Sequence, residues 1–300
     1  MTELVVVFTT FNPAPTFLHA VQNLVREYPV IVVDDGSSQG HDVLDSAEAM
    51  GATIVRQEAN FGIAAALNVG LRSAFASLAK FAVTFDQDSA PEPTTLNVLR
   101  ETYSGIENAE TTVAAVVPAQ FAKVRQTRGS SDRSDARRVI QSGMLISAVA
   151  YSTLGPFDEE LFIDLVDTDF ELRALSRGLR IVAAPTRIDH ELGRTLRLQP
   201  FVRLPFTITT MASAPFRYYY RVRNRITLTR RYFRAMPWRM TQDLAVEAVY
   251  FAVVALSARP RRRMARVMWA GARDALRRRG GPMPASVASH STGISWSSAV

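Results

Sequence analysis

The run Phe81-Ala82-Val83-Thr84-Phe85 is followed at once by Asp86-Gln87-Asp88, and this stretch decides the fold that the sequence predicts. The apolar run has the length and composition of a buried strand. Because alternate residues of an extended chain face the same way, the carboxylates of Asp86 and Asp88 can converge on one hard cation. Open α/β sheets bind ligands at the carboxyl ends of their strands, where this pair would lie. The alternative is a solvated turn whose acids cap the next helix.

Outward from this stretch, short β-prone runs alternate with helical ones. Further strands are predicted at 4–8, 30–33, 53–56, 113–117, 139–147 and 179–183, and helices at 16–27, 63–78, 94–103 and 168–177. Such alternation is typical of βαβ units. We therefore expect an α/β fold with a Rossmann-like, mostly parallel sheet, helices on both of its faces and a helical C-terminal segment.

The composition suits one large domain with an appendage. A chain of 300 residues that is 47% hydrophobic can bury a sizeable core. It has no cysteine, which excludes disulfides, thiolate nucleophiles and cysteine-bound metals and is compatible with a cytoplasmic address. Met1 leads directly into the strand-like run at 4–8, so no signal peptide is expected.

The charges divide the chain into an acidic and a basic part. Residues 1–193 hold 15 basic and 25 acidic side chains, whereas residues 194–279 hold 20 arginines and 3 acids. This asymmetry predicts an acidic catalytic half joined to a basic half that meets something anionic. We expect a catalytic domain at 1–195, a helical segment rich in arginine and aromatic residues at 196–279, and a disordered Gly/Ser/Ala-rich tail at 280–300.

Two more polar turns accompany the predicted strands. Asp34 and Asp35 end the second strand and could meet the hydroxyls and ring N–H of a nucleoside, although the following Gly36-Ser37-Ser38 also fits a plain turn. Asn60-Phe61-Gly62 opens a helix whose N–H groups suit a phosphate, unless Asn60 only caps that helix. No Gly-rich dinucleotide or phosphate loop follows the first strand, which weakens the dehydrogenase and kinase interpretations.

Carboxylates also gather where a later helix begins. Asp164, Asp167 and Asp169 lie just before or at the predicted helix 168–177, and one of them could be a general base. The alternative, acids that complement the helix dipole, explains Asp169 better than Asp164. His190 follows the strand at 179–183 and is either structural or a further metal ligand beside the Asp86/Asp88 pair.

Several motifs, taken in order, resemble the family-2 inverting glycosyltransferases of GT-A fold. They are V-V-V-F-T-T-F-N-P at 5–13, V-V-D-D-G-S-S at 32–38, N-F-G-I-A-A-A-L-N at 60–68, F-D-Q-D-S at 85–89 and F-I-D-L-V-D-T-D-F-E-L-R at 162–173. Within that family the bacterial rhamnosyltransferase group is similar in D-Q-D-S, in S-G-M-L-I at 142–146, in L-G-P-F-D-E-E-L-F-I-D at 154–164 and in R-Y-Y-Y-R-V-R-N at 217–224. The combination covers residues 4–230 and is far more specific than any single motif.

The resemblance implies a role for each matching residue. Asp34 or Asp35 would hold the nucleoside, Thr10 and Asn12 would line its pocket, and Asn60 and Gly62 would lie on the donor side. Asp86 would lie near the ribose and the metal, while Asp88 and His190 would ligate Mn²⁺ or Mg²⁺. Asp167 occupies the place of the catalytic base, with Asp164 left open as an alternative. Ser142, Gly143 and Asp164 are the candidates for the acceptor or sugar side.

The reaction implied is inverting transfer of a sugar, with L-rhamnose from dTDP-L-rhamnose favoured, to a lipid-linked saccharide of a cell-surface polysaccharide. The metal would neutralise the diphosphate, and the base would take a proton from the acceptor hydroxyl. One alternative keeps the fold and changes the donor to a UDP-hexose or UDP-galactofuranose. Another is a catalytically idle, nucleotide-binding membrane scaffold.

The basic half interleaves arginine with aromatic residues, as in 217–224 and 230–234, and Arg261-Arg262-Arg263 follow the apolar run 248–258. That run is too short to cross a bilayer. We therefore expect a peripheral protein on the inner face of the cell membrane, with arginines on anionic headgroups and aromatic residues at the acyl boundary. Nucleic acid is not the expected partner, because the acidic first half suits a metal and a diphosphate-sugar better. Helices that merely pack on the core or pair two subunits are the remaining alternative.

Overall fold

The structure is a computed structural model that describes residues 3–106, 112–122, 124–127, 135–190, 195–198, 208–211 and 213–296, without the side chains of 189–190, 195–198 and 208–211. The chain divides into two compact units. The first comprises Met1–Glu159 and Val166–Glu191, and the second comprises Glu160–Leu165 and Leu192–Val300. The short loop 160–165 therefore interrupts the first unit and belongs to the second. In the Arg/Ser/Asp-rich segment 123–138, which the sequence predicts to be a loop, residues 123 and 128–134 lie outside the described residues.

The first unit alternates strands and helices. Its strands are β1 (Leu4–Thr10), β2 (Val30–Asp34), β3 (Thr53–Arg56), β4 (Phe81–Asp86), β5 (Ser89–Ala90), β6 (Val113–Phe121), β7 (Val124–Arg125), β8 (Met144–Ser147) and β9 (Arg180–His190). Its helices are α1 (Phe17–Leu24), α2 (His41–Ala49), α3 (Ile63–Ala76), α4 (Pro93–Ser104), α5 (Ala148–Leu154) and α6 (Val166–Ser176). A 3₁₀ turn, Glu159–Leu161, begins where the chain passes into the second unit.

The described strands of this unit form one sheet in the order β3-β2-β1-β4-β8-β6-β9-β5, with β7 paired to β6. The pairs β3/β2, β2/β1, β1/β4 and β6/β9 are parallel, and β8 runs antiparallel to both β4 and β6. The predicted α/β class with a mostly parallel sheet is confirmed. The antiparallel β8 is short and follows a loop, so its direction could not be inferred from its apolar composition.

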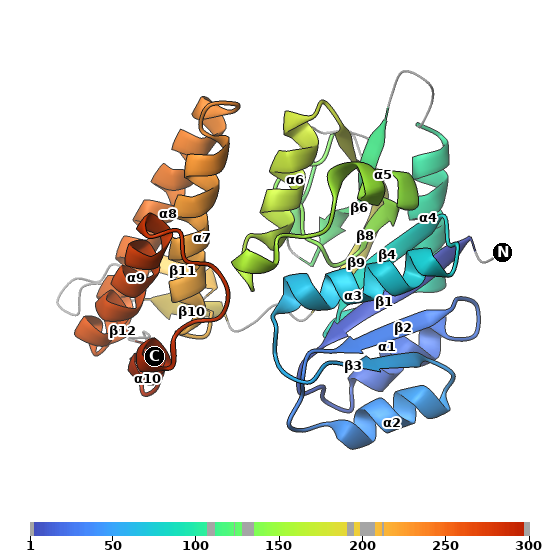
Figure 1. The fold of residues 1–300 in the computed structure, drawn as a ribbon, viewed down its shortest axis with the longest axis horizontal. Coiled ribbons are helices and arrows are strands. Elements are labelled where there is room, and N and C mark those ends of the chain that lie inside the picture. Colours follow the sequence, from blue (N-terminus) through green and yellow to red (C-terminus); the bar gives the residue numbers. More distant parts are fainter. Residues whose placement is uncertain are drawn as a thin grey trace. The chain divides into compact units, whose positions relative to one another are not determined.

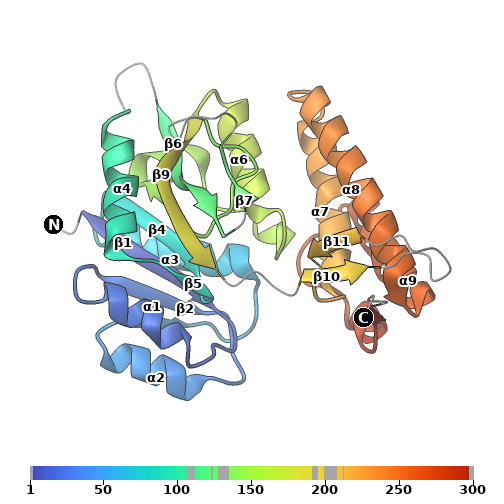
Figure 2. The same ribbon diagram turned by 180° about the vertical axis from the view of Figure 1, so that it is seen from behind.

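Helices cover both faces of the sheet, with α3, α5 and α6 on one face and α1 and α4 on the other (Figures 1 and 2). On the α1 side the ring of Phe8 packs against Phe17 at 5.3 Å and Phe85 at 5.5 Å between ring centroids. On the α3 side Gly70 lets the helix approach the sheet, because a Cβ there would overlap the side chain of Val7. Close packing of both faces fixes the carboxyl ends of β1, β2 and β4 at one edge.

The second unit is mainly helical. It contains α7 (Arg217–Tyr232), α8 (Pro237–Ser257), α9 (Arg261–Leu276) and α10 (Ala285–Ser291), with the strand pairs β10 (Thr195–Leu198) with β11 (Ile208–Met211) and β12 (Ala258–Arg259) with β13 (Ser295–Trp296). Two small clusters form its core. Tyr219 and Tyr220 of α7 pack with Val267 of α9, while Tyr218 of α7 packs with Val254 of α8.

Two features of this unit differ from the sequence prediction. The hairpin β10–β11 was not expected among the helices. The tail predicted to be disordered at 280–300 contains α10 and β13 within its described part, 280–296. Its order comes from tertiary contacts, since Val287 packs with Tyr219 and Tyr220, and the Met283 N–H donates to the Tyr220 hydroxyl at 2.7 Å. Composition alone does not report such contacts.

Helix α8 is longer than the apolar run that the sequence indicates. It spans 21 residues, its most apolar window has a mean hydropathy of 1.3, and 28% of that window is buried. By length and composition alone it could cross a membrane, which corrects the expectation that the apolar run is too short. One such helix is weak grounds for a membrane span, because core helices of soluble proteins have the same character.

Candidate functional site

The predicted donor residues lie in a row at one edge of the sheet. In the parallel register, Thr10 of β1 is beside Asp34 of β2, and Thr9 of β1 is beside Asp86 of β4. The three strands are neighbours in the sheet and end together. The structure therefore brings together Thr9 and Asp86, which are 77 residues apart in the sequence, at the position where open α/β sheets bind ligands.

Asn12 and Asp34 build the turn that follows β2. Asn12 has a left-handed backbone, with φ of 51°, and its Oδ1 accepts from the N–H groups of Ser38 at 2.9 Å and Gln39 at 3.0 Å. The Ser37 hydroxyl bonds to the Asp34 carboxylate and accepts from the Asn12 N–H at 2.6 Å. Asn12 is therefore first of all a support for the 34–39 turn.

Asp35 links the end of β2 to the start of α3. Its carboxylate accepts from the N–H groups of Phe61 at 2.8 Å and Gly62 at 2.9 Å and from the Gln57 amide at 2.9 Å. Burial raises the pKa of the Asp35 carboxyl to about 6, against the lowering effect of the two backbone N–H groups. The predicted residues Asn60 and Gly62 thus join the same network, where the Asn60 Oδ1 also accepts from the Gly62 N–H at 3.2 Å.

A second loop holds the turn that carries the acidic pair. Gln141 donates a short hydrogen bond from Nε2 to the Asp86 carboxylate, and the Ser142 hydroxyl accepts from the Asp86 N–H at 3.1 Å. The hydroxyls of Ser142 and Ser89 are 2.6 Å apart, and the Gly143 N–H donates to the carbonyl of Thr84 at 2.7 Å. Ser142 is fully buried, so this placement makes it a support of the Asp86–Ser89 turn rather than a surface that an acceptor meets.

Gly143 has a left-handed backbone with φ of 84°, and a Cβ there would overlap the Ile188 side chain. Sequence reasoning missed the roles of Gln141 and Gln87, whose Oε1 accepts from the Phe11 N–H at 2.7 Å. The position of Gln87 between two aspartates was the available signal. Gln141 gave none beyond its place next to Ser142.

The two predicted metal ligands lie at one strand pair, since Asp88 directly precedes β5 and His190 ends β9. Ser89, which follows Asp88, pairs with His190 in the antiparallel ladder of β5 and β9. The His190 side chain lies outside the described residues, and no group of three described His, Cys, Asp or Glu side chains is assembled for a metal. The donor set nevertheless fits a divalent cation, since Asp86 and Asp88 offer carboxylate oxygens and the buried Oε1 of Gln141 has no hydrogen-bond partner among the described residues.

The acids at the start of α6 separate into different roles. Asp169 is almost completely buried and lies 3.3 Å from Arg173, and the carboxylate of the buried Glu171 accepts from the Val139 N–H at 3.2 Å. Asp167 is only half-buried, and its Oδ1 accepts from the Thr168 N–H at 2.7 Å. Of the acids in α6, Asp167 is the least buried.

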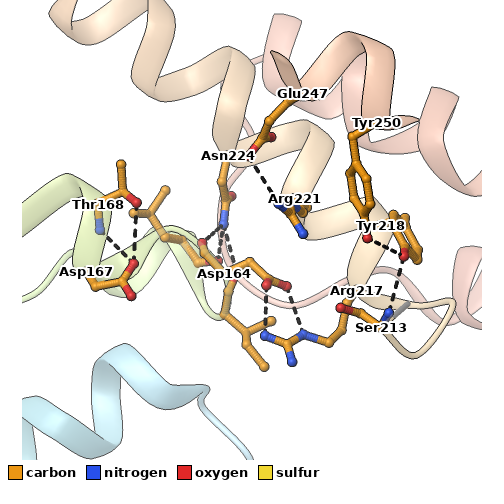
Figure 3. A network of polar contacts seen from close by, with 12 residues as sticks. Asp164, Asp167, Thr168, Ser213, Arg217, Tyr218, Arg221, Asn224, Glu247 and Tyr250 are labelled. Carbon is orange, nitrogen blue, oxygen red and sulfur yellow. Dashed lines mark hydrogen bonds and ion pairs between the residues drawn. The ribbon is translucent and has the colours of Figure 1, made fainter. Parts of the chain in front are cut away.

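Asp164 lies in the second unit and forms an ion pair with Arg217. The guanidinium donates from Nη2 to Oδ1 at 2.8 Å and from Nε to Oδ2 at 3.1 Å. Both carboxylate oxygens of Asp164 are therefore engaged by the guanidinium (Figure 3). This contact favours Asp167 over Asp164 as the candidate base.

The arginines of the segment 217–224 face the interior of the second unit. Arg223 has an exposed fraction of 1%, and Arg221 pairs with Glu247 at 3.5 Å. The predicted role on lipid headgroups is therefore wrong for Arg223. Exposed arginines of the second unit lie at the end of α7 and just after it, at 230, 231 and 234, and in α9 and after it, at 261–263, 266 and 277–279.

A mostly parallel α/β sheet with acidic turns at its carboxyl edge defines the class of nucleotide-sugar transferases of GT-A fold. Residues 5–157 match Glycosyl transferase family 2, and the chain belongs to that family. The fold agrees, since S. aureus TarS aligns with a TM-score of 0.50 at 16% identity over 74% of this chain and 38% of the TarS chain.

Two further relatives extend the comparison. A dTDP-rhamnosyl transferase, RfbF of Shigella flexneri, is 28% identical over 244 residues, which cover 75% of this chain and 79% of RfbF. The S. aureus TarS 1–349 fragment in complex with UDP-GlcNAc aligns with a TM-score of 0.50 at 15% identity over 74% of this chain and 64% of that chain. The chain thus spans less than two thirds of either TarS structure. The predicted family and enzyme class are confirmed, and a nucleotide-sugar donor follows from them.

Proposed function

We propose that this glycosyltransferase transfers L-rhamnose from dTDP-L-rhamnose, with inversion, to a lipid-linked saccharide of a cell-surface polysaccharide. The sugar is supported by the 28% identity to a protein named as a dTDP-rhamnosyl transferase. The observation that carries the chemistry is the row of acids at the sheet edge together with Asp167, half-buried at the start of α6. A UDP-hexose or UDP-galactofuranose donor is the alternative within the same chemistry.

In the proposed reaction Asp167 takes the proton of the acceptor hydroxyl as that oxygen attacks the anomeric carbon. The bond from that carbon to the diphosphate breaks on the opposite face, so the configuration inverts without a covalent enzyme intermediate. General-base help of this kind contributes about 10²–10⁴-fold. Asp34 and Asp35, with Thr10 and Asn12, form the nucleoside side of the site, and Asn60 and Gly62 lie beside the start of α3.

Asp86, Asp88 and His190 would hold a divalent cation, Mn²⁺ or Mg²⁺. When bound, such a cation neutralises charge on the diphosphate leaving group. The carboxylates are placed by the 141–143 loop, whose hydrogen bonds fix the Asp86–Ser89 turn. Fixed geometry at the turn reduces the rearrangement that diphosphate binding requires.

The test is nucleoside diphosphate release by the purified protein. We would offer dTDP-rhamnose, UDP-galactofuranose, UDP-galactose and UDP-glucose, each with Mn²⁺, Mg²⁺ or EDTA. We expect metal-dependent release from dTDP-rhamnose. Release of nucleoside diphosphate from another donor alone would exclude rhamnose as the sugar but remain consistent with the proposed mechanism. No release from any donor, even with a lipid-linked acceptor present, would favour the catalytically idle scaffold.

Variants assign the roles of the acids. Asp167→Asn should lower turnover by about 10²-fold or more and leave the Kd for dTDP unchanged, because a base acts after the donor binds. Asp88→Ala should remove the metal-dependent part of dTDP binding. Asp45→Asn, an exposed aspartate of α2, is the matched control. Full turnover by Asp167→Asn would end its assignment as the base and make Asp164 the next candidate.

We further propose that the second unit attaches the enzyme to an anionic membrane, on the cytoplasmic face where lipid-linked acceptors are built. The acids of α8, Asp243 and Glu247, point inward to Arg225 at 3.6 Å and 3.2 Å, so the outward face of this helix carries no charge over 244–253. Its exposed residues include Leu244, Val246 and Val249. A helix with charges inside and apolar residues outside fits a lipid interface rather than water.

Helix α9 supplies a complementary surface. Arg262, Arg266, Trp269, Arg273 and Leu276 follow one another at spacings of three or four residues and therefore share one face. Trp269 is 67% exposed and Leu276 is 64% exposed. Arginines for headgroups beside an exposed tryptophan and leucine are the composition of an interfacial helix.

A further inference from the structure

Segment 139–143, which leads into β8, is bound to the end of β4 within the first unit. The Thr84 hydroxyl donates to the carbonyl of Gln141 at 2.6 Å, and the Asp86 N–H donates to the Ser142 hydroxyl at 3.1 Å. Both contacts lie where β4 reaches the edge of the sheet that carries the acidic turns. The segment and the Asp86 turn therefore form one hydrogen-bonded structure.

The rest of the segment has anchors of its own. The Val139 N–H donates to the Glu171 carboxylate at 3.2 Å, the Ile140 N–H to the Gln126 Oε1 at 2.7 Å, and the Gly143 N–H to the carbonyl of Thr84 at 2.7 Å. The side chains of Glu171 and Gln126 are fully buried. Every residue of segment 139–143 is thus held by a contact that does not involve the side chain of Gln141.

The side-chain amide of Gln141 serves a different purpose. Its Nε2 donates to Oδ1 of the half-buried Asp86 carboxylate. Its Oε1 is buried, in a residue with an exposed fraction of 5%, and has no hydrogen-bond partner among the described residues. A buried amide oxygen without a partner lowers the stability of a fold. An apolar side chain of the same size would avoid this cost, so folding stability alone does not explain a glutamine here.

The hydrogen bond to Oδ1 determines how the Asp86 carboxylate is turned. The terminal torsion of an aspartate is broad when nothing holds it. One fixed oxygen also fixes the direction of the other, so the carboxylate presents a single geometry at the ligand edge. Partners that orient a ligating carboxylate in this way typically change metal affinity by about 10–10²-fold when they are removed.

We propose that Gln141 is a positioning residue for the donor, whose amide orients the Asp86 carboxylate for the cation and the diphosphate although its unpartnered oxygen destabilises the fold. The proposal rests on the role given to Asp86 under the proposed function. It separates two tasks within one segment: the backbone contacts of 139–143 hold the turn in place, and the Gln141 amide sets the angle of one carboxylate.

Gln141→Met is the variant that tests this separation. Methionine has about the length and volume of glutamine and adapts to its surroundings, so it removes the hydrogen bond to Asp86 and the unpartnered oxygen without opening a cavity. Gln22→Met, at an exposed glutamine of α1, is the matched control. If Gln141→Met fails to fold by circular dichroism, Gln141→Asn replaces it, because its amide is one methylene too short to reach Asp86.

The first measurement is the thermal unfolding of the full chain. The Tm of Gln141→Met should equal or exceed that of the wild type, because the variant no longer buries an unpartnered amide oxygen. A Tm lowered by more than about 5 °C would show that the amide serves the fold, and it would overturn the proposal.

The second measurement is calorimetric titration of the same proteins with dTDP, in Mn²⁺ and in EDTA. Gln141→Met should raise the Kd in Mn²⁺ by about 10–10²-fold and leave the Kd in EDTA within about twofold of the wild type. Gln22→Met should change neither value. A purely structural role for Gln141 predicts no such difference between Mn²⁺ and EDTA in a protein with an unchanged Tm.

Asp88→Ala distinguishes failure of this proposal from failure of the proposed function. If Asp88→Ala loses the metal-dependent part of dTDP binding while Gln141→Met retains it, positioning by Gln141 is refuted and the metal assignment stands. If Asp88→Ala retains it as well, the metal assignment of the proposed function fails, and the role given to Gln141 fails with it.

Discussion

Individual aspartates of this chain have different structural roles, although the sequence motif does not distinguish them. Asp34 and Asp35 are adjacent, yet Asp35 is bound by Gln57, Phe61 and Gly62, while Asp34 bonds to Ser37 in its own turn. The motif as a whole therefore supports both the turn after β2 and the start of α3. The hydrogen bonds of Asp35 leave Asp34 as the better candidate for a nucleoside contact.

The pH dependence of stability tests the structural role of Asp35. Its pKa is about 6 in the folded protein against an ordinary value of 3.8, so the folded state binds more protons between these two values. The free energy of unfolding contributed by this group is therefore present below pH 4 and is lost as pH rises through 6. The shift corresponds to about 3 kcal/mol at most.

Asp35→Asn is neutral at every pH and should lose this dependence. We expect the free energy of unfolding of the wild type, relative to Asp35→Asn, to fall between pH 4.5 and pH 7.0 in urea denaturation. Asp45→Asn, at an exposed carboxyl, gives the background for loss of a carboxylate. A difference that rises with pH would mean that the three hydrogen bonds outweigh the burial of Asp35.

At the scale of elements, the approach of α7 and α9 depends on one glycine. A Cβ at Gly271 of α9 would lie 2.3 Å from the carbonyl oxygen of Tyr219 in α7. The same two helices are joined by the hydrogen bond from the Tyr219 hydroxyl to the Asp274 carboxylate at 2.9 Å. Both contacts require the helix backbones to be close.

Gly271→Ala should therefore destabilise the protein by about 1–3 kcal/mol, the usual cost of overpacking. The expected sign is informative, because alanine in place of glycine inside an ordinary helix stabilises by about 1 kcal/mol. Chemical denaturation followed by circular dichroism measures the change. A more stable Gly271→Ala protein would show that α7 and α9 can separate at no cost.

The elements of the first unit were predictable because each carries its own signal. Strands such as β1 and β4 are continuous apolar runs, and α3 is rich in alanine and leucine with Gly62 before it. The antiparallel direction of β8, the hairpin β10–β11 and helix α10 were not predicted, since they depend on partners far away in the sequence. Val287, for example, is ordered by tyrosines almost seventy residues earlier.

The acidic residues of the candidate site could be predicted from the sequence, but the residues that hold them in place could not. Asp86, Asp88 and Asp167 occur in recognisable motifs, and the register of β1, β2 and β4 follows from the fold. The partner of Asp164 is 53 residues away in the sequence, so no local pattern predicts the ion pair with Arg217. For the same reason the sequence indicates an arginine-rich surface where Arg223 is in fact buried.

Across the whole molecule, the arginines of the basic half form two groups: one is paired inside the second unit, and the other is exposed. In α7 the arginines at 217, 221 and 223 face acids and carbonyls inside the second unit, among them Asp164, Glu247 and the carbonyl of Leu161. Arg230 and Arg231 at the end of α7 are exposed, as are most arginines of α9 and the residues after it, where Trp269 shares a helix face with Arg262 and Arg266. The exposed arginines are the ones available to bind an anionic surface.

Vesicle binding by the full chain tests this division. Arg262→Glu with Arg266→Glu should weaken co-sedimentation with vesicles of phosphatidylglycerol and phosphatidylcholine by at least about tenfold, since each basic residue near such a surface contributes about 1 kcal/mol. Val246→Asp with Val249→Asp should weaken binding at high salt too, because the lost contact is apolar. Arg26→Glu with Lys80→Glu, exposed residues of the first unit, makes the same change of charge and should have little effect. Equal loss in this control, or equally tight binding to duplex DNA, would mean that the surface of α8 and α9 responds to charge alone and is not a lipid-binding face.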